Sequence, residues 1–238
     1  MPSMSKPFDI AIDGPVAAGK GTVSRQVADQ LGFLYVDTGA MYRCAAYLAL
    51  QNKIDFEDVT ALVKLINSKK IELKVPDGDK NDGRLATILL DGEDVTWKIR
   101  TEEVSSAVPH VAKLPEIRKI MVAKQQQIAE NQDVVMEGRD ITTRVLPEAD
   151  LKIFMTASSR VRAQRRLKQL IDRGEILNFK EVYNELLERD TIDSSRQTDP
   201  LTIADGAWVI DTSKLSIKEV VTKIIERVNN MRRQHDTR

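Results

Sequence analysis

Residues 14–22 read Gly-Pro-Val-Ala-Ala-Gly-Lys-Gly-Thr and come directly after the apolar run Phe8–Ile12. The pattern predicts a buried strand, a glycine-rich loop and an amphipathic helix from about Lys20 to Leu31. The glycines let the backbone turn so that several N–H groups point at one anion, and the helix N-terminus adds partial positive charge. Lys20 adds a full charge that can reach the outer phosphates of a nucleotide. The stretch therefore predicts a P-loop for a nucleoside triphosphate and not a plain glycine turn.

Short apolar runs alternate with amphipathic stretches along the rest of the chain. Further strands are expected at Phe33–Val36, Val134–Met136, Leu151–Met155 and Val209–Asp211. Helices are expected at Ala40–Gln51, Phe56–Asn67, Thr101–His110, Leu114–Asn131, Ser159–Arg173 and Phe179–Asp190. A Ser216-x-x-Glu219 capping box predicts the start of a final helix that runs to about Arg232. Repeated strand–helix units predict an α/β fold with a parallel, doubly wound sheet that binds ligands at the carboxyl ends of its strands.

The pattern changes between residues 71 and 96. The runs Ile71–Val75, Leu85–Leu90 and Glu93–Thr96 have strand composition. They are separated by the turn residues Asp77-Gly78-Asp79, Asn81-Asp82-Gly83 and Asp91-Gly92. Such turns between short strands are typical of hairpins. We therefore expect a small antiparallel meander inserted into the alternating chain.

Composition excludes several classes of protein. Lys plus Arg and Asp plus Glu number 36 each, so no global charge draws the chain onto nucleic acid or an anionic membrane. The single cysteine, Cys44, cannot form an internal disulfide, and two histidines make a histidine-based metal site improbable. No apolar run approaches the ~20 residues that span a bilayer, and no secretory segment precedes Phe8. We expect a cytoplasmic monomer without nucleic-acid or membrane partners.

Two motifs narrow the class of P-loop protein. Gly21 stands where Ser or Thr usually follows the lysine, and the hydroxyl comes one place later at Thr22. This displaced form is similar to that of nucleoside monophosphate kinases. The string Asn52-Lys53-Ile54-Asp55 matches the guanine-reading motif of GTPases, but it follows a helical stretch and not a strand. We interpret it as a helix exit.

Three polar clusters carry a more specific resemblance. They are Asp37-Thr38-Gly39-Ala40-Met41-Tyr42-Arg43, Glu137-Gly138-Arg139-Asp140, and Arg189-Asp190-x-x-Asp193-x-x-Arg196 followed by Pro200-Leu201. With the P-loop and the meander, these clusters closely resemble the bacterial cytidylate kinases from Phe8 to Arg227. The resemblance implies an enzyme that uses ATP and Mg²⁺ to phosphorylate CMP and dCMP by direct in-line transfer. A kinase for UMP or AMP, and a nucleotide-binding switch, are the alternatives.

The resemblance also implies how the chain is organised. We expect one P-loop kinase domain over residues 1–238, with its core at about 8–43, 133–157 and 205–230. The acceptor-binding region with the β insert is expected at about 44–132. A short helical lid with arginine-rich helices is expected at about 158–204, and it includes Arg160, Arg162, Arg165 and Arg166. A run of charge is most often an exposed face, so at least two of these four arginines are expected to be solvated.

Residue roles follow from chemistry and from the resemblance. We expect the donor phosphates to contact Gly14, Pro15, Val16, Ala17, Ala18, Gly19, Lys20, Gly21 and Thr22. The acceptor is expected to contact Thr38, Arg43, Arg118, Arg139, Asp140, Arg189, Asp193 and Arg196. The catalytic set is Lys20, Arg139, Arg189 and Arg196, because transfer between two polyanions needs charge that neutralises phosphates. The metal ligands are undetermined, with Thr22 and Asp37 as candidates that could act through water.

Within this set, forked guanidinium groups of Arg43 and Arg139 suit the acceptor phosphate. Asp140 suits the N4 amine of cytosine, and Thr38, Arg118 and Arg196 can donate to its acceptor edge. Arg189 and Asp193 are four apart on a helix, so from spacing alone they could merely bridge each other. The chain departs from the family pattern at Pro109, Thr142, Asp199 and Gly206, which bears on the preference between CMP and dCMP.

Overall fold

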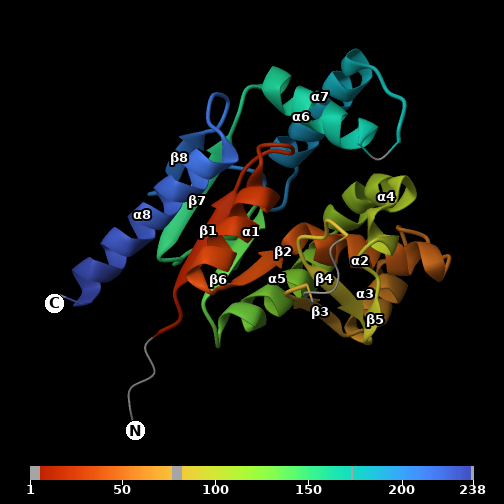
Figure 1. The fold of residues 1–238 in the computed structure, drawn as a ribbon. Coiled ribbons are helices and arrows are strands. Elements are labelled where there is room, and N and C mark those ends of the chain that lie inside the picture. The colour runs from red at the N-terminus through yellow and green to blue at the C-terminus, as the bar shows by residue number, and fades with distance from the viewer. Residues whose placement is uncertain (1–5, 77–81, 173, 237–238) are drawn as a thin grey trace, which may run out of the picture.

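The structure is a computed structural model that describes residues 6–76, 82–172 and 174–236. Its central sheet has five strands, β2 (Leu34–Asp37), β6 (Val134–Gly138), β1 (Asp9–Asp13), β7 (Leu151–Thr156) and β8 (Trp208–Asp211), in that spatial order. Every pairing within it is parallel. The predicted α/β fold with a parallel sheet is therefore confirmed (Figure 1).

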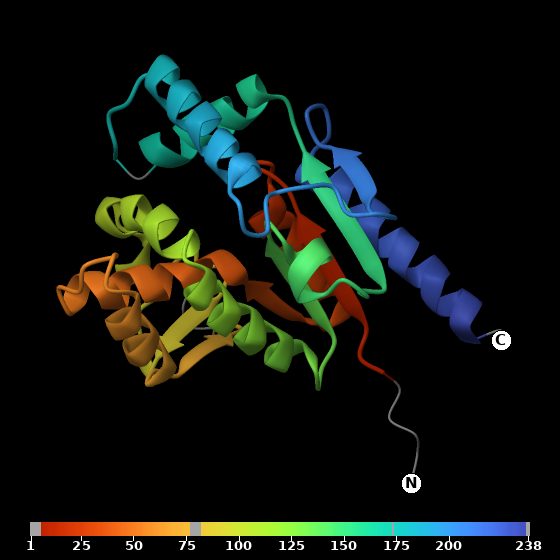
Figure 2. The same ribbon diagram turned by 180° about the vertical axis from the view of Figure 1, so that it is seen from behind.

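Helices cover both faces of this sheet. The helices α1 (Lys20–Leu31) and α8 (Ile217–Asp236) lie side by side on the face turned to the viewer in Figure 1. Seen from behind in Figure 2, the opposite face carries the short turn η2 (Ile141–Val145), against which α5 (Pro115–Ala129) packs. Strands β6 and β1 are buried along almost their whole length, which explains their largely apolar sequences, whereas every second residue of β7 is partly exposed.

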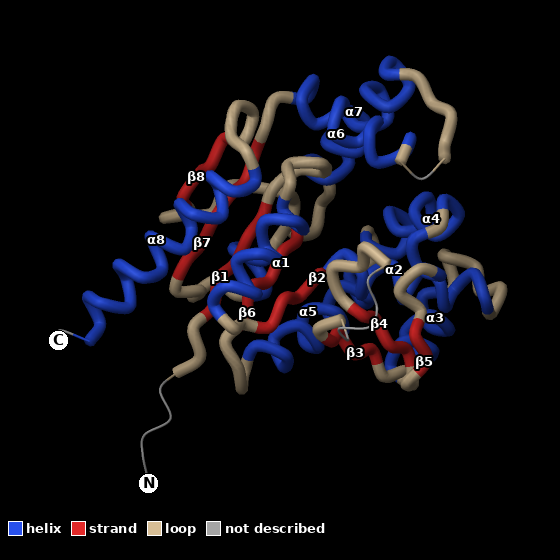
Figure 3. Tube along the Cα trace, viewed as in Figure 1, coloured by secondary structure: helices blue, strands red, loops and turns tan. Residues whose placement is uncertain are grey.

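A second group of elements follows β2 and forms its own lobe. It contains α2 (Thr38–Gln51), α3 (Val59–Asn67), η1 (Lys98–Arg100), α4 (Glu102–Ala112) and α5. The strands β3 (Ile71–Lys74), β4 (Thr87–Leu90) and β5 (Glu93–Asp94) pair antiparallel in this lobe, apart from the central sheet (Figure 3). The predicted meander is thus confirmed, although the predicted turn over residues 77–81 lies outside the described residues.

The remaining two helices, α6 (Ser159–Ile171) and α7 (Phe179–Ser195), pack against each other above the carboxyl ends of the strands. α7 begins at a capping box in which Asn178 and Glu181 satisfy each other's backbone N–H groups. It continues five residues beyond the predicted end at Asp190, so Asp193 lies on the helix. The predicted capping box of Ser216 and Glu219 is confirmed at the start of α8.

A buried carboxylate joins the first strand to the turn that follows β6. Asp13 is fully buried, and its oxygens accept hydrogen bonds from the backbone N–H of Ile141 at 2.9 Å and of Thr142 at 2.7 Å. The Thr142 hydroxyl donates a third bond at 2.6 Å, so the threonine at this unusual position has a structural partner. These bonds fix the residues that directly follow Asp140.

Replacing Asp13 with alanine is expected to lower the free energy of unfolding by about 2–4 kcal/mol, because two buried N–H groups lose their acceptor. Urea unfolding followed by circular dichroism measures the change. The matched control is Asp205→Ala, at an exposed carboxylate, which is expected to stay within about 0.5 kcal/mol. A loss below about 1 kcal/mol at Asp13 would contradict the role given to this carboxylate.

Candidate active site

The P-loop forms a tight turn around the ammonium group of Lys20. Its Nζ donates to the carbonyl oxygens of Gly14 at 2.8 Å and of Pro15 at 2.9 Å. Gly14 has a φ of 150°, and a side chain there would meet the backbone carbonyl of Met155. Gly19 lies at the N-terminus of α1 with a φ of 92°. Both glycines are therefore required by the backbone itself.

Lys20 is only 6% exposed, and its surroundings are unfavourable for a charge. Burial, together with the nearby guanidinium of Arg139, lowers the pKa of Lys20 to about 7. Burial, followed by the negative charge of Asp37, raises the pKa of the neighbouring Glu137 carboxyl. A polyphosphate beside Lys20 would restore the charged form of the lysine, so the loop is suited to an anion.

The space beside Gly21 of the P-loop is narrow. A side chain at Gly21 would come within 3.0 Å of Glu137 Oε1 and 3.3 Å of Leu85 Cδ1. The hydroxyl of Tyr35, which donates to Glu137 Oε1 at 2.6 Å, lies 3.5 Å from the same point. A side chain at position 21 would therefore require Glu137 and Leu85 to move by a few tenths of an ångström, and the hydroxyl of the loop comes from Thr22.

Two adjoining cavities meet beside this loop. The larger has a volume of about 490 Å³ and is lined by the P-loop, by Gln169 of α6 and by Arg84 and Trp97 of the insert. The smaller, of about 250 Å³, is lined by residues of α2, α5 and α7 and by the end of β6. The residues that line both are Val16, Arg43, Arg100, Glu137, Arg139 and Arg166. Four guanidinium side chains thus stand where the cavities join.

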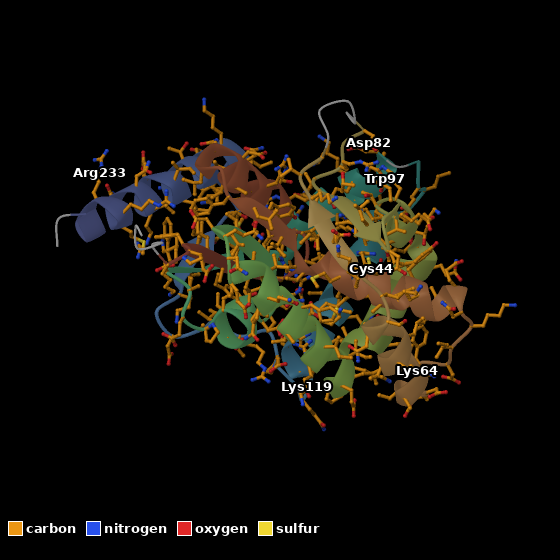
Figure 4. The ribbon with its side chains drawn as sticks, turned by 90° about the horizontal axis from the view of Figure 1, so that it is seen from below. Cys44, Lys64, Asp82, Trp97, Lys119 and Arg233 are labelled. Carbon is orange, nitrogen blue, oxygen red and sulfur yellow. The ribbon has the colours of Figure 1, made fainter. Side chains whose placement is uncertain are left out.

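Part of the larger cavity is built by the inserted meander. Figure 4 shows Asp82 and Trp97 next to each other, and the indole Nε1 of Trp97 donates to Asp82 Oδ2 at 2.8 Å. Arg84 binds Asp82 and also Asp94, with its Nη1 at 2.6 Å from Asp94 Oδ2. These contacts lie within the insert and fix the positions of Arg84 and Trp97, which line the cavity.

The arginines around the junction crowd one another. Burial and the nearby charge of Arg189 lower the pKa of Arg43 to about 10. Burial and Arg139 lower the pKa of Arg189 in the same way. Arg43 donates to the hydroxyl of Ser105 at 2.7 Å, which is a neutral partner, and the nearby charge of Asp37 only partly offsets the effects of burial and of Arg189. Such crowding of like charges favours a site that receives anions.

The carboxylate of Asp193 takes a partner that sequence spacing did not indicate. Its Oδ2 lies 2.7 Å from Nε of Arg139, on the end of β6. Burial alone would raise the pKa of Asp193, but the charge and hydrogen bond of Arg139 outweigh it and hold that pKa below its ordinary value. Asp193 therefore orients Arg139 across the cavity, and the charge of Arg189, four residues earlier on α7, adds to the attraction that Asp193 experiences.

The four residues expected to read the acceptor base lie together in the smaller cavity. Arg118 pairs with Asp140 through Nη2 and Oδ2, and Nη2 of Arg196 is 3.8 Å from Asp140 Oδ1. Thr38 donates from its hydroxyl to the backbone oxygen of Glu137 at 2.7 Å. Burial raises the pKa of Asp140, and the two guanidinium groups oppose that effect. The Nη2 atom of Arg196 is buried without a hydrogen-bond partner, as expected of a donor aimed at a ligand.

The four arginines of α6 differ from the expectation of a solvated face. Only Arg160 is exposed among them. Arg162 is buried and forms a forked pair with Asp190, at 2.9 and 2.6 Å. Arg165 donates to the backbone oxygen of Thr212 at 2.8 Å. Arg162 and Arg165 thus find partners because α6 packs on α7 and beside the P-loop, whereas Arg160 is exposed and Arg166 is partly exposed where it lines both cavities.

Sequence reasoning gave no role to several residues that line the site. Arg100 lies 63 positions from Asp37 in the chain, yet its Nη2 is 3.1 Å from Asp37 Oδ2. Glu137 is the last residue but one of β6, beside Lys20, and was visible in the sequence as part of a polar cluster at a strand end. No local pattern distinguishes Arg100, because the pairing joins the insert to the start of α2.

The segment Asn52-Lys53-Ile54-Asp55 begins at the C-terminal end of a helix, as predicted. Asn52 is the C-cap of α2, and Lys53 follows with a left-handed φ of 52°. Pro109 lies inside α4 and lines a small hollow between α4 and α7. Neither feature contributes to the two cavities described above.

The described residues contain no group of three or more His, Cys, Asp or Glu side chains placed to hold a metal ion. Among Thr22, Asp37 and Glu137, only Thr22 and Glu137 line the larger cavity with the P-loop. The oxygens of Asp37 are engaged by the backbone N–H of Ala40 at 3.0 Å and by Arg100.

No helix in the described part of the chain is long and apolar enough to span a membrane.

Known proteins resemble this chain over nearly its full length. A sequence profile described as cytidylate kinase matches residues 10–230. A cytidylate kinase from Geobacillus sp. is 50% identical over 220 residues, which cover 92% of this chain and 96% of that protein. A cytidylate kinase from Bacillus subtilis is 45% identical over 231 residues, 97% of this chain and all of that protein.

Among solved structures, an uncharacterised protein from Eubacterium ventriosum has a TM-score of 0.52 and 12% identity, covering 94% of this chain and 99% of that one. At that identity the likeness concerns the fold alone. The profile match over residues 10–230 includes the P-loop, the meander and the arginine-rich helices. Since half of the aligned positions agree with one curated cytidylate kinase, the resemblance inferred from the motifs is confirmed, and the chain belongs to the cytidylate kinase family.

Proposed function

We propose that this member of the cytidylate kinase family transfers the γ-phosphoryl group of ATP to CMP or dCMP, giving CDP or dCDP. The observation that carries the proposal is the junction of the two cavities, where Arg43, Arg100, Arg139 and Arg166 line both. One cavity opens on the P-loop and the other on the paired Arg118 and Asp140. Two anionic substrates bound there would bring their phosphates together among these guanidinium groups.

On the donor side, the P-loop from Gly14 to Thr22 holds the phosphates of ATP through backbone N–H groups at the N-terminus of α1. Lys20 exchanges its bonds to the loop carbonyls for the outer phosphate oxygens. Because the ammonium is buried, its charge acts on the phosphates with little screening by solvent. No covalent intermediate is required, so transfer is direct and in line.

On the acceptor side, Arg43 and Arg139 bind the phosphate of CMP, and Arg189 and Arg196 add charge at the transferred group. Asp140 accepts from the N4 amine of cytosine, while Arg118 and Arg196 donate to O2 and N3. Thr38 donates to the same edge in exchange for its bond to the backbone oxygen of Glu137. Uracil reverses the hydrogen-bonding character of positions 3 and 4. It would leave buried polar groups unpaired, which is the basis of selection against UMP.

A magnesium ion fits the oxygen donors of the larger cavity. Thr22 and Glu137 would hold it, in part through water, because Mg²⁺ prefers oxygen ligands and keeps several waters. When bound, it neutralises charge on the β- and γ-phosphates. Glu137 is kept in place for this role by the hydroxyl of Tyr35. Asp37 fits less well, since both of its oxygens already have partners.

The domain organisation supports a closing motion. Residues 8–43, 133–157 and 205–230 form the core, residues 44–132 bind the acceptor, and α6 and α7 within residues 158–204 act as the lid. Arg166 lines both cavities from the lid, so lid closure would bring this charge onto the phosphates and exclude water. We further propose that the enzyme acts as a monomer in the cytoplasm.

The test is a coupled assay of ADP formation from ATP with CMP, dCMP, UMP or AMP as the acceptor. CMP and dCMP are expected to stimulate ADP formation at least about 100-fold above the rate with ATP alone, and UMP and AMP much less. Equal turnover with and without CMP would indicate a nucleotide switch and contradict the proposal. Faster turnover with UMP or AMP than with CMP would replace the proposed acceptor.

A further inference from the structure

The residue that holds the base-reading arginines lies outside the acceptor cavity. Asp199 follows α7 and is not among the residues that line that cavity, but its Oδ2 accepts from Nε of Arg118 at 2.9 Å. Arg118 is 2% exposed and also donates to Asp140, through Nη2, and to the backbone oxygen of Ala112, at 3.4 Å. Three of its five N–H groups are thus engaged, and two remain for a ligand.

The backbone of Asp199 holds the second arginine. Its carbonyl oxygen accepts from Nε of Arg196 at 2.6 Å, which leaves the Nη2 atom of Arg196 buried without a partner beside Asp140. Asp199 adopts a left-handed φ of 47°, although a residue before proline normally prefers an extended conformation. Asp and Asn tolerate this conformation better than other side chains, and Gly tolerates it best. One residue therefore contacts both arginines, through different atoms.

We propose that Asp199 is a positioning residue that sets the selectivity of this enzyme for the acceptor base. The proposal rests on the proposed function, because it assigns Arg118 and Arg196 to the base of CMP. Binding of the Nε edge by Asp199 fixes the rotation of the Arg118 guanidinium about its last side-chain bonds. The remaining N–H groups then point in a defined direction, as bidentate recognition requires.

The negative charge of Asp199 supports selection of cytosine as well, in addition to its effect on the orientation of Arg118. Arg118 and Arg196 bring two positive charges, and Asp140 alone would neutralise only one of them. Asp199, which the more exposed Arg144 also approaches at 3.9 Å, brings a second negative charge to these two arginines, so Asp140 can offer an oxygen to the N4 amine of cytosine. Without Asp199 the excess positive charge would favour the carbonyl oxygen that uracil carries at the same position. Loss of Asp199 is therefore expected to relax selection against UMP.

The test compares Asp199→Gly and Asp199→Asn with the wild-type enzyme. Glycine keeps the left-handed backbone and the carbonyl that binds Arg196, but it removes the carboxylate. Asparagine keeps an uncharged acceptor for Nε of Arg118. Asp205→Asn, at the exposed carboxylate in the same connecting segment, is the matched control. The measurements are kcat and KM for CMP and for UMP, KM for ATP, and thermal unfolding of each variant.

In the glycine variant, KM for CMP is expected to rise about 10-fold with little change in kcat, and the ratio of kcat/KM for CMP over UMP to fall about 10-fold. The asparagine variant is expected to show smaller changes in both quantities than the glycine variant. Its ratio of kcat/KM for CMP over UMP is expected to be about threefold below the wild-type value. KM for ATP is expected to stay within about twofold in both variants, a pattern that general loss of stability would not produce.

An unchanged CMP-to-UMP ratio in the glycine variant overturns the proposal. If that variant does not fold, the asparagine variant decides alone, and an unchanged ratio there has the same consequence. A loss that affects ATP and CMP equally also overturns it. These failures differ from failure of the proposed function, which would show in the wild-type enzyme as absence of CMP-dependent ADP formation.

Discussion

Replacing Lys20 with methionine is expected to lower kcat by about 100- to 1,000-fold, the range found when one charge-stabilising donor is removed from a transition state. The ammonium group is the full positive charge that the P-loop itself brings to the donor phosphates, and it is buried where solvent screens it little. Methionine has a similar length without charge. Since burial already disfavours the charged lysine, the variant is expected to remain folded.

The coupled assay at saturating CMP measures this effect, with thermal unfolding as the check on folding. Lys218→Met, at an exposed position in the first turn of α8, is the matched control and should retain full activity. If the Lys20 variant keeps more than about one tenth of wild-type kcat, the lysine does not stabilise the transferred phosphoryl group. Another positively charged group would then have to stabilise the donor phosphates, and the role proposed for Lys20 would be wrong.

Replacing Asp140 with asparagine is expected to lower kcat/KM for CMP by about 1,000-fold or more, while ATP binding changes little. The carboxylate has to satisfy Arg118 and the N4 amine of cytosine at the same time, and an amide offers only one oxygen. When a hydrogen-bonding pocket and its substrate are mismatched in this way, kcat/KM falls by several orders of magnitude. Asparagine has the same shape, so the loss would come from chemistry and not from a cavity.

Calorimetric titration with ATP alone separates the two substrates in this variant. The dissociation constant for ATP is expected to stay within about threefold of the wild-type value, because Asp140 does not line the larger cavity. Asp205→Asn again provides the control for a surface carboxylate. Equal losses for ATP and CMP would show that Asp140 supports the whole fold of the site, and the assignment of the base pocket would be wrong.

Local sequence was enough to predict the elements that depend on neighbouring residues. The P-loop needs glycines and a lysine within nine positions, and the capping box of Ser216 and Glu219 lies within four. The meander was predicted because strand runs and turn residues alternate at short range. Strand and helix ends were less accurate: α7 extends beyond Asp190, and its last turn contains Asp193, whose carboxylate pairs with Arg139, 54 positions away in the chain.

Long-range partners could not be predicted in the same way. Arg162 was expected in a solvated run, but it pairs with Asp190, 28 positions away. Asp199 was visible only as an unusual residue, and its carboxylate reaches Arg118 across 81 positions. A charged side chain gives no sequence signal of its partner, because an ion pair requires only that the fold bring two groups within a few ångströms.

The amino-acid sequence by itself determined the phosphate loop, the alternation of strands and helices, and the kinase family, since each depends on residue types at short and regular spacing. The tertiary structure decided which carboxylate each arginine binds and which arginines stand between the two cavities. The physical reason is that chain folding, and not chain order, sets the distances over which charges and hydrogen bonds act.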